Sequence, residues 1–247
     1  MTTLLLRLGA PLQSWGTSSR FVRRNTDRAP SRSGVLGMLA AAQGRRRTDP
    51  LEDLLDLRIG IRVDQPGQLE RDFQTARTRD GSTSMPLSYR FYLADAVFAV
   101  AVEGDPDLLH SVQQALRSPV FPLFLGRRSC PPAGRLLHGL HDGTLLDRLR
   151  RHPWLASPWV QRRHHGATVD LDIVMDCPAD APDAELVRDE PISFDPRERR
   201  YGWRSVHRDT VTVPNPAHRA PAPTSAASTV TDPFDPMAAF EGIASCT

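Results

Sequence analysis

Residues 124–131 read FLGRRSCP and place two adjacent arginines, Arg127 and Arg128, directly after Gly126. Prolines at positions 119, 122, 131 and 132 flank this stretch, as is typical of a loop. A glycine lets the backbone approach a bulky group closely, and guanidinium groups form paired hydrogen bonds with phosphate oxygens. These residue types at this spacing indicate a loop that binds a polyanion. The alternative, from these eight residues alone, is a surface turn with solvated arginines.

The positive charge is concentrated in the first fifth of the chain. Residues 1–48 contain nine arginines and one acidic residue, Asp27, although the net charge of the 247 residues is only +2. Such a cluster is typical of proteins that bind a phosphate backbone. All 31 Lys or Arg residues of the sequence are arginine. Mechanisms that need a lysine side chain, such as Schiff-base formation, are therefore excluded for this sequence.

The composition is that of a globular protein, with 40% hydrophobic and 24% charged residues. No apolar run approaches the ~20 residues of a membrane-spanning helix, and the first residues lack a signal-peptide pattern, so we expect a cytoplasmic protein without membrane contact. The three cysteines are far apart and form no CxxC pair. We therefore expect neither disulfides nor a zinc site, and we expect no cofactor.

The hydrophobic pattern predicts alternating strands and helices that could position the arginine loop. Residues 3–11 favour a buried strand, a helix follows with Ser31 or Ser33 near its N-cap, and residues 51–57 favour a short helix. Further strands are predicted at 58–64 and 95–103, with an amphipathic helix over 105–118. Between them, residues 65–90 are polar and basic, which favours a projecting hairpin. With a candidate strand at 135–140, this order is that of a βαββαβ unit.

The second half of the chain is less regular. It predicts a short helix over 144–152, a strand over 167–177 and further strands within 188–196 and 201–213. From residue 214 the chain is rich in Pro, Ala, Ser and Thr, which favours a disordered tail over 214–247. These patterns predict an α+β body over 1–140 and a smaller, mostly β extension over 141–213.

Several separate segments, in this order, resemble one known family. They are GAPLQSWG (9–16), PSRSGVLGMLAA (30–41), RDFQT (71–75), YLADAVFAVAV (92–102), FLGRRSCP (124–131) and RDEPISF (188–194). Together they resemble the CasD-type subunits of the type I-E CRISPR surveillance complex, Cascade, which belong to the RAMP superfamily. The resemblance spans residue 1 to about residue 205.

This resemblance implies an RRM-like, or ferredoxin-like, RAMP body whose arm at about 65–90 is a β-hairpin thumb. It implies a non-catalytic subunit of a ribonucleoprotein complex for antiviral defense, which binds the 5′ handle of the CRISPR RNA (crRNA). The implied protein partners are the backbone, large and other Cascade subunits, and target DNA is met only through the complex. The family motifs and their neighbours give these RNA-binding candidates: Gln13, Trp15, Arg32, Ser33, Gly34, Gly126, Arg127, Arg128 and Ser129. The thumb candidates, which mix cations with rings as single-strand binders do, are Arg71, Phe73, Arg77 and Arg79.

Several of these assignments have an ordinary structural alternative. Trp15 follows a strand and could equally be a core residue, and Ser33 with Gly34 could simply open a helix, although backbone N–H groups at a helix N-terminus also bind phosphate. Any one arginine of the arm could be a solvated surface charge. We weigh these alternatives against the structure below.

Two other functions remain open at this point. Histidines could act as acid and base in metal-independent RNA cleavage, as a related RAMP subunit of another CRISPR subtype does. The candidates for that chemistry are His138, His141, His164 and His165, with Asp170 and Asp172 nearby in sequence. A protein–protein scaffold without RNA contact is also compatible with the low net charge.

Overall fold

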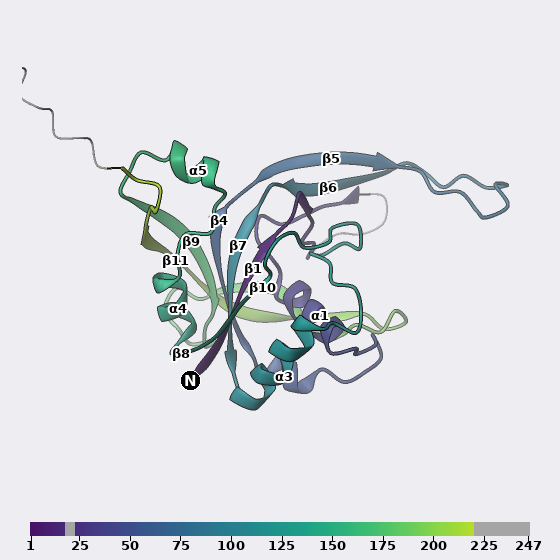
Figure 1. Cartoon of the computed structure of the whole chain (residues 1–247). Helices are drawn as coiled ribbons and strands as arrows, with labels where there is room; N and C mark the ends of the chain where they lie inside the picture. Colours follow the sequence, from purple (N-terminus) through teal and green to yellow (C-terminus); the bar gives the residue numbers. More distant parts are fainter. Residues whose placement is uncertain (18–22, 220–247) are drawn as a thin grey trace, which may run out of the picture.

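The structure is a computed structural model, described here for residues 1–17 and 23–219. It is a mixed α/β protein dominated by strands (Figure 1). The helices are α1 (Arg32–Ala42), α2 (Glu52–Leu55), α3 (Pro106–Arg117), α4 (Leu145–Arg151) and α5 (Pro158–Arg163). The strands are β1 (Thr2–Gly9), β2 (Leu12–Gln13), β3 (Arg23–Arg24), β4 (Arg58–Gln65), β5 (Gln68–Gln74), β6 (Ser88–Ala94), β7 (Val97–Gly104), β8 (Leu137–Asp142), β9 (Thr168–Asp176), β10 (Glu185–Ser193) and β11 (Arg200–Pro214).

Seven strands form the central sheet in the order β10-β11-β9-β4-β7-β1-β8, and each neighbouring pair is antiparallel. The strands of residues 1–140 and those that follow therefore share one sheet, joined where β9 pairs with β4. A polypeptide divided at residue 140 would lose this pairing.

Both faces of the central sheet are covered, which explains why β1 and β7 are buried along almost their whole length. One core packs Leu4, Leu6 and Leu8 of β1 against α1, α2 and α3. A second core, on the opposite face, packs Leu5 of β1 against α4 and β9. Figure 1 shows α1 and α3 on one side of the sheet and α4 on the other. This arrangement leaves the N-terminal end of α1 at the edge of the first core, beside the arginine loop.

Local signals account for most helix boundaries. Ser31 is the N-cap of α1 and its hydroxyl accepts a hydrogen bond from the Gly34 amide. Asp105 caps α3 in the same way, with Pro106 in the first turn, and Thr144 caps α4. The strand predicted at 95–103 begins only at Val97, because Asp95 has a φ of 57° and cannot continue an extended strand.

A second, smaller sheet carries a projecting arm. Strands β5 and β6 form an antiparallel hairpin, and every residue of β5 is exposed. Figure 1 shows the hairpin and its tip extending away from the body. On its other edge β6 pairs with β2 and, in parallel, with β3. The arm is thus continuous with the segment that leads from β1 to α1.

The described chain continues past the predicted start of the tail. Pro214 still pairs with Thr168, and the buried Asn215 side chain donates hydrogen bonds to the carbonyls of Gln161, His164 and Gly166. Residues 220–247 of the predicted tail lie outside the described residues. No helix within 1–17 and 23–219 has the length and apolar character needed to cross a membrane.

Candidate nucleic-acid interface

The arginine loop is fastened to the segment that follows β1. The Leu125 amide donates to the Cys130 carbonyl at 2.7 Å, which closes the loop, and the Ser14 amide donates to the Leu125 carbonyl at 3.2 Å. Gly126 has a φ of +82°, and a Cβ placed on it would lie 1.7 Å from the Ser14 carbonyl oxygen. Glycine is therefore required at this position because two segments of protein backbone approach each other closely here. The sequence analysis instead expected the glycine to allow the approach of RNA.

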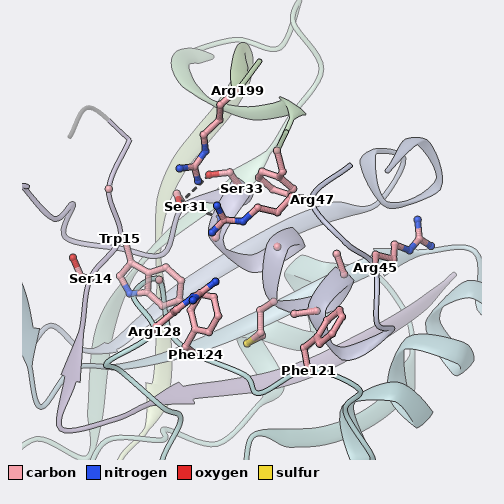
Figure 2. Close-up of a pocket in the computed structure, with 18 of the residues that line it drawn as sticks. Ser14, Trp15, Ser31, Ser33, Arg45, Arg47, Phe121, Phe124, Arg128 and Arg199 are labelled. Atoms are coloured by element: carbon pink, nitrogen blue, oxygen red, sulfur yellow. Dashed lines mark hydrogen bonds between the residues drawn. The ribbon is translucent and has the colours of Figure 1, made fainter. Parts of the chain in front are cut away.

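The two arginines of the loop have different environments. The Arg127 guanidinium lies 4.6 Å above the Tyr92 ring and donates to the Arg24 carbonyl at 2.7 Å, so it is partly buried and already engaged. Arg128 is exposed and lines an open hollow beside α1 (Figure 2). Gly126 lines the same hollow. Ser129 is exposed next to them. Of the pair, Arg128 is the more exposed, whereas the Nη1 atom of Arg127 is buried and has no hydrogen-bond partner among the described residues.

Gln13 and Trp15, both expected to contact RNA, lie in the interior of the protein. Both side chains are fully buried. The Gln13 amide nitrogen donates to the Ala96 carbonyl at 2.6 Å, and its oxygen accepts from the Trp15 indole nitrogen at 3.1 Å. A Cβ on Gly34 would lie 2.8 Å from the Trp15 ring, so this glycine allows α1 to pack on the indole. Trp15 is thus the core residue that the sequence left as an alternative.

Arg32, another residue expected to contact RNA, is also internal, with 5% of its surface exposed. Its guanidinium forms ion pairs with Asp176 and Glu190 and donates to the carbonyls of Leu55 and Leu57. Its backbone amide donates to the Asp189 carboxylate at 2.7 Å. Burial raises the pKa of the Glu190 carboxyl, and the charge of Arg32 opposes that rise. Arg32 therefore ties the start of α1 to β9 and β10.

Around these internal residues, two adjoining hollows form an open surface that we call the arginine groove. The α1 hollow, about 440 Å³, lies over the first turns of α1, where Ser33 and Gly34 are partly exposed. The hairpin hollow, about 940 Å³, lies between the Thr17 and Arg24 segments and the β10–β11 hairpin. The two share Ser14, Gly16, Gly126, Arg199 and Tyr201 in their linings.

The lining of the arginine groove has one sign of charge. It contains no aspartate or glutamate among the described residues. Its arginines are Arg24, Arg45, Arg46, Arg47, Arg127, Arg128, Arg188, Arg199 and Arg200. Arg45 pairs with Asp53, whereas Figure 2 shows Arg47, Arg128 and Arg199 around the α1 hollow. A concave surface lined in this way concentrates anions and presents forked donors for phosphate oxygens.

The β10–β11 hairpin supplies part of this groove that the sequence analysis did not assign. Arg199 and Tyr201 line both hollows, and Arg188 and Trp203 line the hairpin hollow. A signal for them exists in the run PRERRYGW (196–203), which interleaves arginines with two aromatic residues. That signal marks binding chemistry without saying which other segments the hairpin faces.

The four thumb candidates lie on the arm rather than in the groove. Arg71 and Phe73 are exposed on β5, and the Arg71 guanidinium lies 5.5 Å from the Tyr89 ring centroid. Arg77 and Arg79 are exposed near the tip, where Arg77 bridges to Ser84. The arm thus offers a second cationic and aromatic surface.

The histidines proposed for catalysis lie elsewhere in the molecule. His138 and His152 stack edge to face with ring centroids 5.0 Å apart, and His164 contacts Trp154 and the Thr168 carbonyl. None of the histidines that the structure describes lines the arginine groove. Nor do the described residues include a group of three or more His, Cys, Asp or Glu side chains that could hold a metal ion. The geometry does not bring these histidines to the arginine loop.

The histidine pair makes stability depend on pH. Burial, with the nearby charges of His138 and Arg62, lowers the pKa of His152 from 6.5 to about 4. Above pH 6.5 the ring is neutral in both folded and unfolded chains. As the pH falls from 6.5 towards 4, the unfolded chain takes up a proton that the folded protein does not, so the free energy of unfolding decreases. Since the ring is partly exposed, we expect a loss of about 1 to 2 kcal/mol.

Unfolding measured by urea between pH 7 and pH 4 checks this prediction. The variant His152→Gln should show a shallower pH dependence than the unmodified protein, and His165→Gln, at an exposed position, should not. An unchanged slope in His152→Gln would contradict the assignment.

The known proteins that this chain resembles are CRISPR-associated proteins. A family model described as CRISPR-associated protein (Cas_Cas5) matches residues 3–207. The CRISPR system Cascade subunit CasD of Escherichia coli (strain K12) is 33% identical in an alignment of length 161 that covers 57% of this chain and 70% of that protein. Among solved structures, a "CRISPR RNA-guided surveillance complex" chain matches with a TM-score of 0.72 and 33% identity, covering 89% of this chain and 94% of that chain. A chain from "Crystal structure of Cas protein" matches with a TM-score of 0.67 and 36% identity, covering 90% and 100%.

Proposed function

Because this chain belongs to the Cas5 family of CRISPR-associated proteins, we propose that it is a non-catalytic, RNA-binding subunit of a Cascade-type, RNA-guided surveillance complex. Its ligand is the 5′ handle of the crRNA, the repeat-derived single strand. The observation that carries the proposal is the arginine groove, in which nine arginines and no acid line two adjoining hollows. Such a surface suits a single-stranded polyanion, whose phosphates are accessible from all sides.

The finer features of the fold belong to the same proposal. The order β8-β1-β7-β4 with α1 and α3 as connections supports an RRM-like, ferredoxin-like body, and the exposed β5–β6 hairpin supports a thumb. In the complex, the thumb with Arg71, Phe73, Arg77 and Arg79 contacts the RNA where the handle ends. The subunit also contacts the backbone and large subunits, and meets target DNA through the assembly in the cytoplasm.

Within the groove, the roles of the residues divide into contact and support. Ser33, Gly34, Gly126, Arg128 and Ser129 lie at or beside the open surface and face the RNA. Gln13, Trp15, Arg32 and Arg127 hold the segments that carry it. The helix N-terminus contributes less than expected, because the Arg32 and Gly34 amides already donate to Asp189 and Ser31.

Removing two exposed arginines of the groove tests this function. We expect Arg47→Ala with Arg128→Ala to weaken binding of labelled repeat RNA by at least about tenfold, because each removes a charged hydrogen-bond donor. The slope of log K against log salt should fall by about 0.7 for each phosphate that the variant no longer binds. The matched control is Arg150→Ala with Arg151→Ala, which removes the same charge from exposed positions at the end of α4.

Gels run in EDTA separate the alternatives. Native gels across a salt series measure affinity, and denaturing gels of the same mixtures report whether the RNA stays intact. Equal affinity and slope in both double variants would contradict the groove assignment and favour a scaffold without RNA contact. Shortened RNA would show a processing nuclease instead.

A further inference from the structure

The hairpin hollow carries a feature that phosphate binding does not explain. Trp203 lines it with 63% of its surface exposed. The indole contributes to neither hydrophobic core. Arginines share the lining with it, and no acid does. An exposed aromatic ring set among guanidinium groups is the combination found where unpaired bases stack beside bound phosphates.

The strand that carries Trp203 is held rigidly by its opposite face. Side chains alternate along β11, so Arg204 points away from Trp203. The Arg204 guanidinium forms two hydrogen bonds with the Asp189 carboxylate, at 2.6 and 3.0 Å, and an ion pair with Asp176. The Asp189 side chain that makes these contacts is only 2% exposed. The indole is therefore presented from a fixed strand rather than from a mobile loop, so little entropy is lost when a ring stacks on it.

A β-bulge lies opposite Trp203. Val187 pairs with Arg204 and Glu190 with Gly202, so β10 places two residues, Arg188 and Asp189, against one residue of β11. Such bulges redirect side chains and are frequent near functional sites. Here the extra residue lets Asp189 turn inward to Arg204 while Arg188 turns outward into the hairpin hollow, where its Nε donates to the Tyr201 carbonyl at 3.4 Å. The bulge thus sets an arginine beside the exposed indole.

We propose that Trp203 is the stacking platform for one unstacked base of the bound RNA, and that Arg188 holds a phosphate next to that base. This inference rests on the proposed function, because it names the part of the strand that occupies the hairpin hollow. Stacking on an indole accepts any base, so this position contributes affinity and fixes the path of the strand without reading its sequence.

The first test compares two exposed tryptophans. We expect Trp203→Ala to weaken binding of labelled repeat RNA by about tenfold, as loss of one stacked base does, without changing the salt slope. Trp203→Phe keeps a ring and should retain most of the affinity. Trp159→Ala is the matched control, since this side chain is 51% exposed on α5, outside both hollows. Equal affinity of the Trp203→Ala and Trp159→Ala proteins would overturn the proposal.

The second test locates the stacked base. A set of repeat RNAs, each with one abasic position, is titrated against the unmodified protein and against Trp203→Ala. One position should weaken binding to the unmodified protein and have no further effect in the variant, because both changes remove the same contact. Additive losses at every position would contradict stacking on Trp203. If Trp203→Ala has no effect, the Arg47→Ala/Arg128→Ala protein shows which proposal is wrong. If this double variant loses affinity for the RNA in the same assay, only the stacking platform is wrong. If it binds the RNA as tightly as the unmodified protein, the proposed function is wrong as well.

Discussion

Replacing Gly126 with alanine should lower the free energy of unfolding by about 2 to 4 kcal/mol and reduce RNA affinity with it. The positive φ of this residue disfavours any side chain, and the new methyl group would lie 1.7 Å from the Ser14 carbonyl oxygen. Since that oxygen belongs to backbone, relief requires the arginine loop to move away from the segment after β1. The movement would displace Arg128 and open the groove.

Gly81 offers a matched control for this substitution. Its φ of +74° is close to that of Gly126, but nothing lies within 4 Å of a Cβ built there. Gly81→Ala should therefore cost only about 1 kcal/mol, the price of the left-handed conformation. Urea unfolding of both variants gives the comparison. Equal losses would mean that the contact with Ser14 has no energetic weight.

Replacing Arg32 with alanine should cost about 3 to 5 kcal/mol of stability, because it leaves the partly buried Glu190 without its cation and Asp176 with Arg204 alone. The two carbonyls that Arg32 satisfies, those of Leu55 and Leu57, would also lose a donor. Chemical denaturation measures the loss, and Arg32→Lys, which keeps the charge but cannot reach all these partners, should lose less.

A surface ion pair provides the reference for Arg32. Arg45 pairs with Asp53, whose side chain is 46% exposed, so Arg45→Ala should cost no more than about 1 kcal/mol. If instead Arg32→Ala kept full stability and lost only RNA affinity, Arg32 would be the RNA contact that its motif suggested, and the internal role described above would be wrong.

The sequence allowed the elements to be predicted better than their assembly. Periodicity and caps are local, so the helices at α1, α3 and α4 and the strands at β4 and β9 were predicted to within a few residues. Burial of polar residues is not local. Asp189, which accepts a hydrogen bond from the Arg32 amide, lies 157 positions further along the chain. No sequence pattern near Arg32 or Gln13 indicates that their side chains are internal.

For the same reason, only part of the candidate site could be predicted from the sequence. The motif around Gly126 and Arg128 marked one wall of the groove, and the start of α1 marked its floor. The sequence predicted β10 and β11 only as separate strands. The position of their hairpin against α1 could not be predicted, because it depends on Arg204 and Asp189, which the β-bulge brings together. A charged run beside aromatic residues indicated chemistry, but tertiary contacts decided where that chemistry is used.

The ion pairs that fasten the hairpin to α1 also bear on the order of synthesis. The walls of the groove come from the beginning, the middle and the last described strand of the chain. A chain still attached to the ribosome has neither Trp203 nor the arginine that holds its strand until more than four fifths of the 247 residues have left the exit tunnel. For the proposed function, this means that only chains extending beyond Trp203 and Arg204 present both hollows to RNA, whereas shorter nascent or truncated chains lack the hairpin hollow.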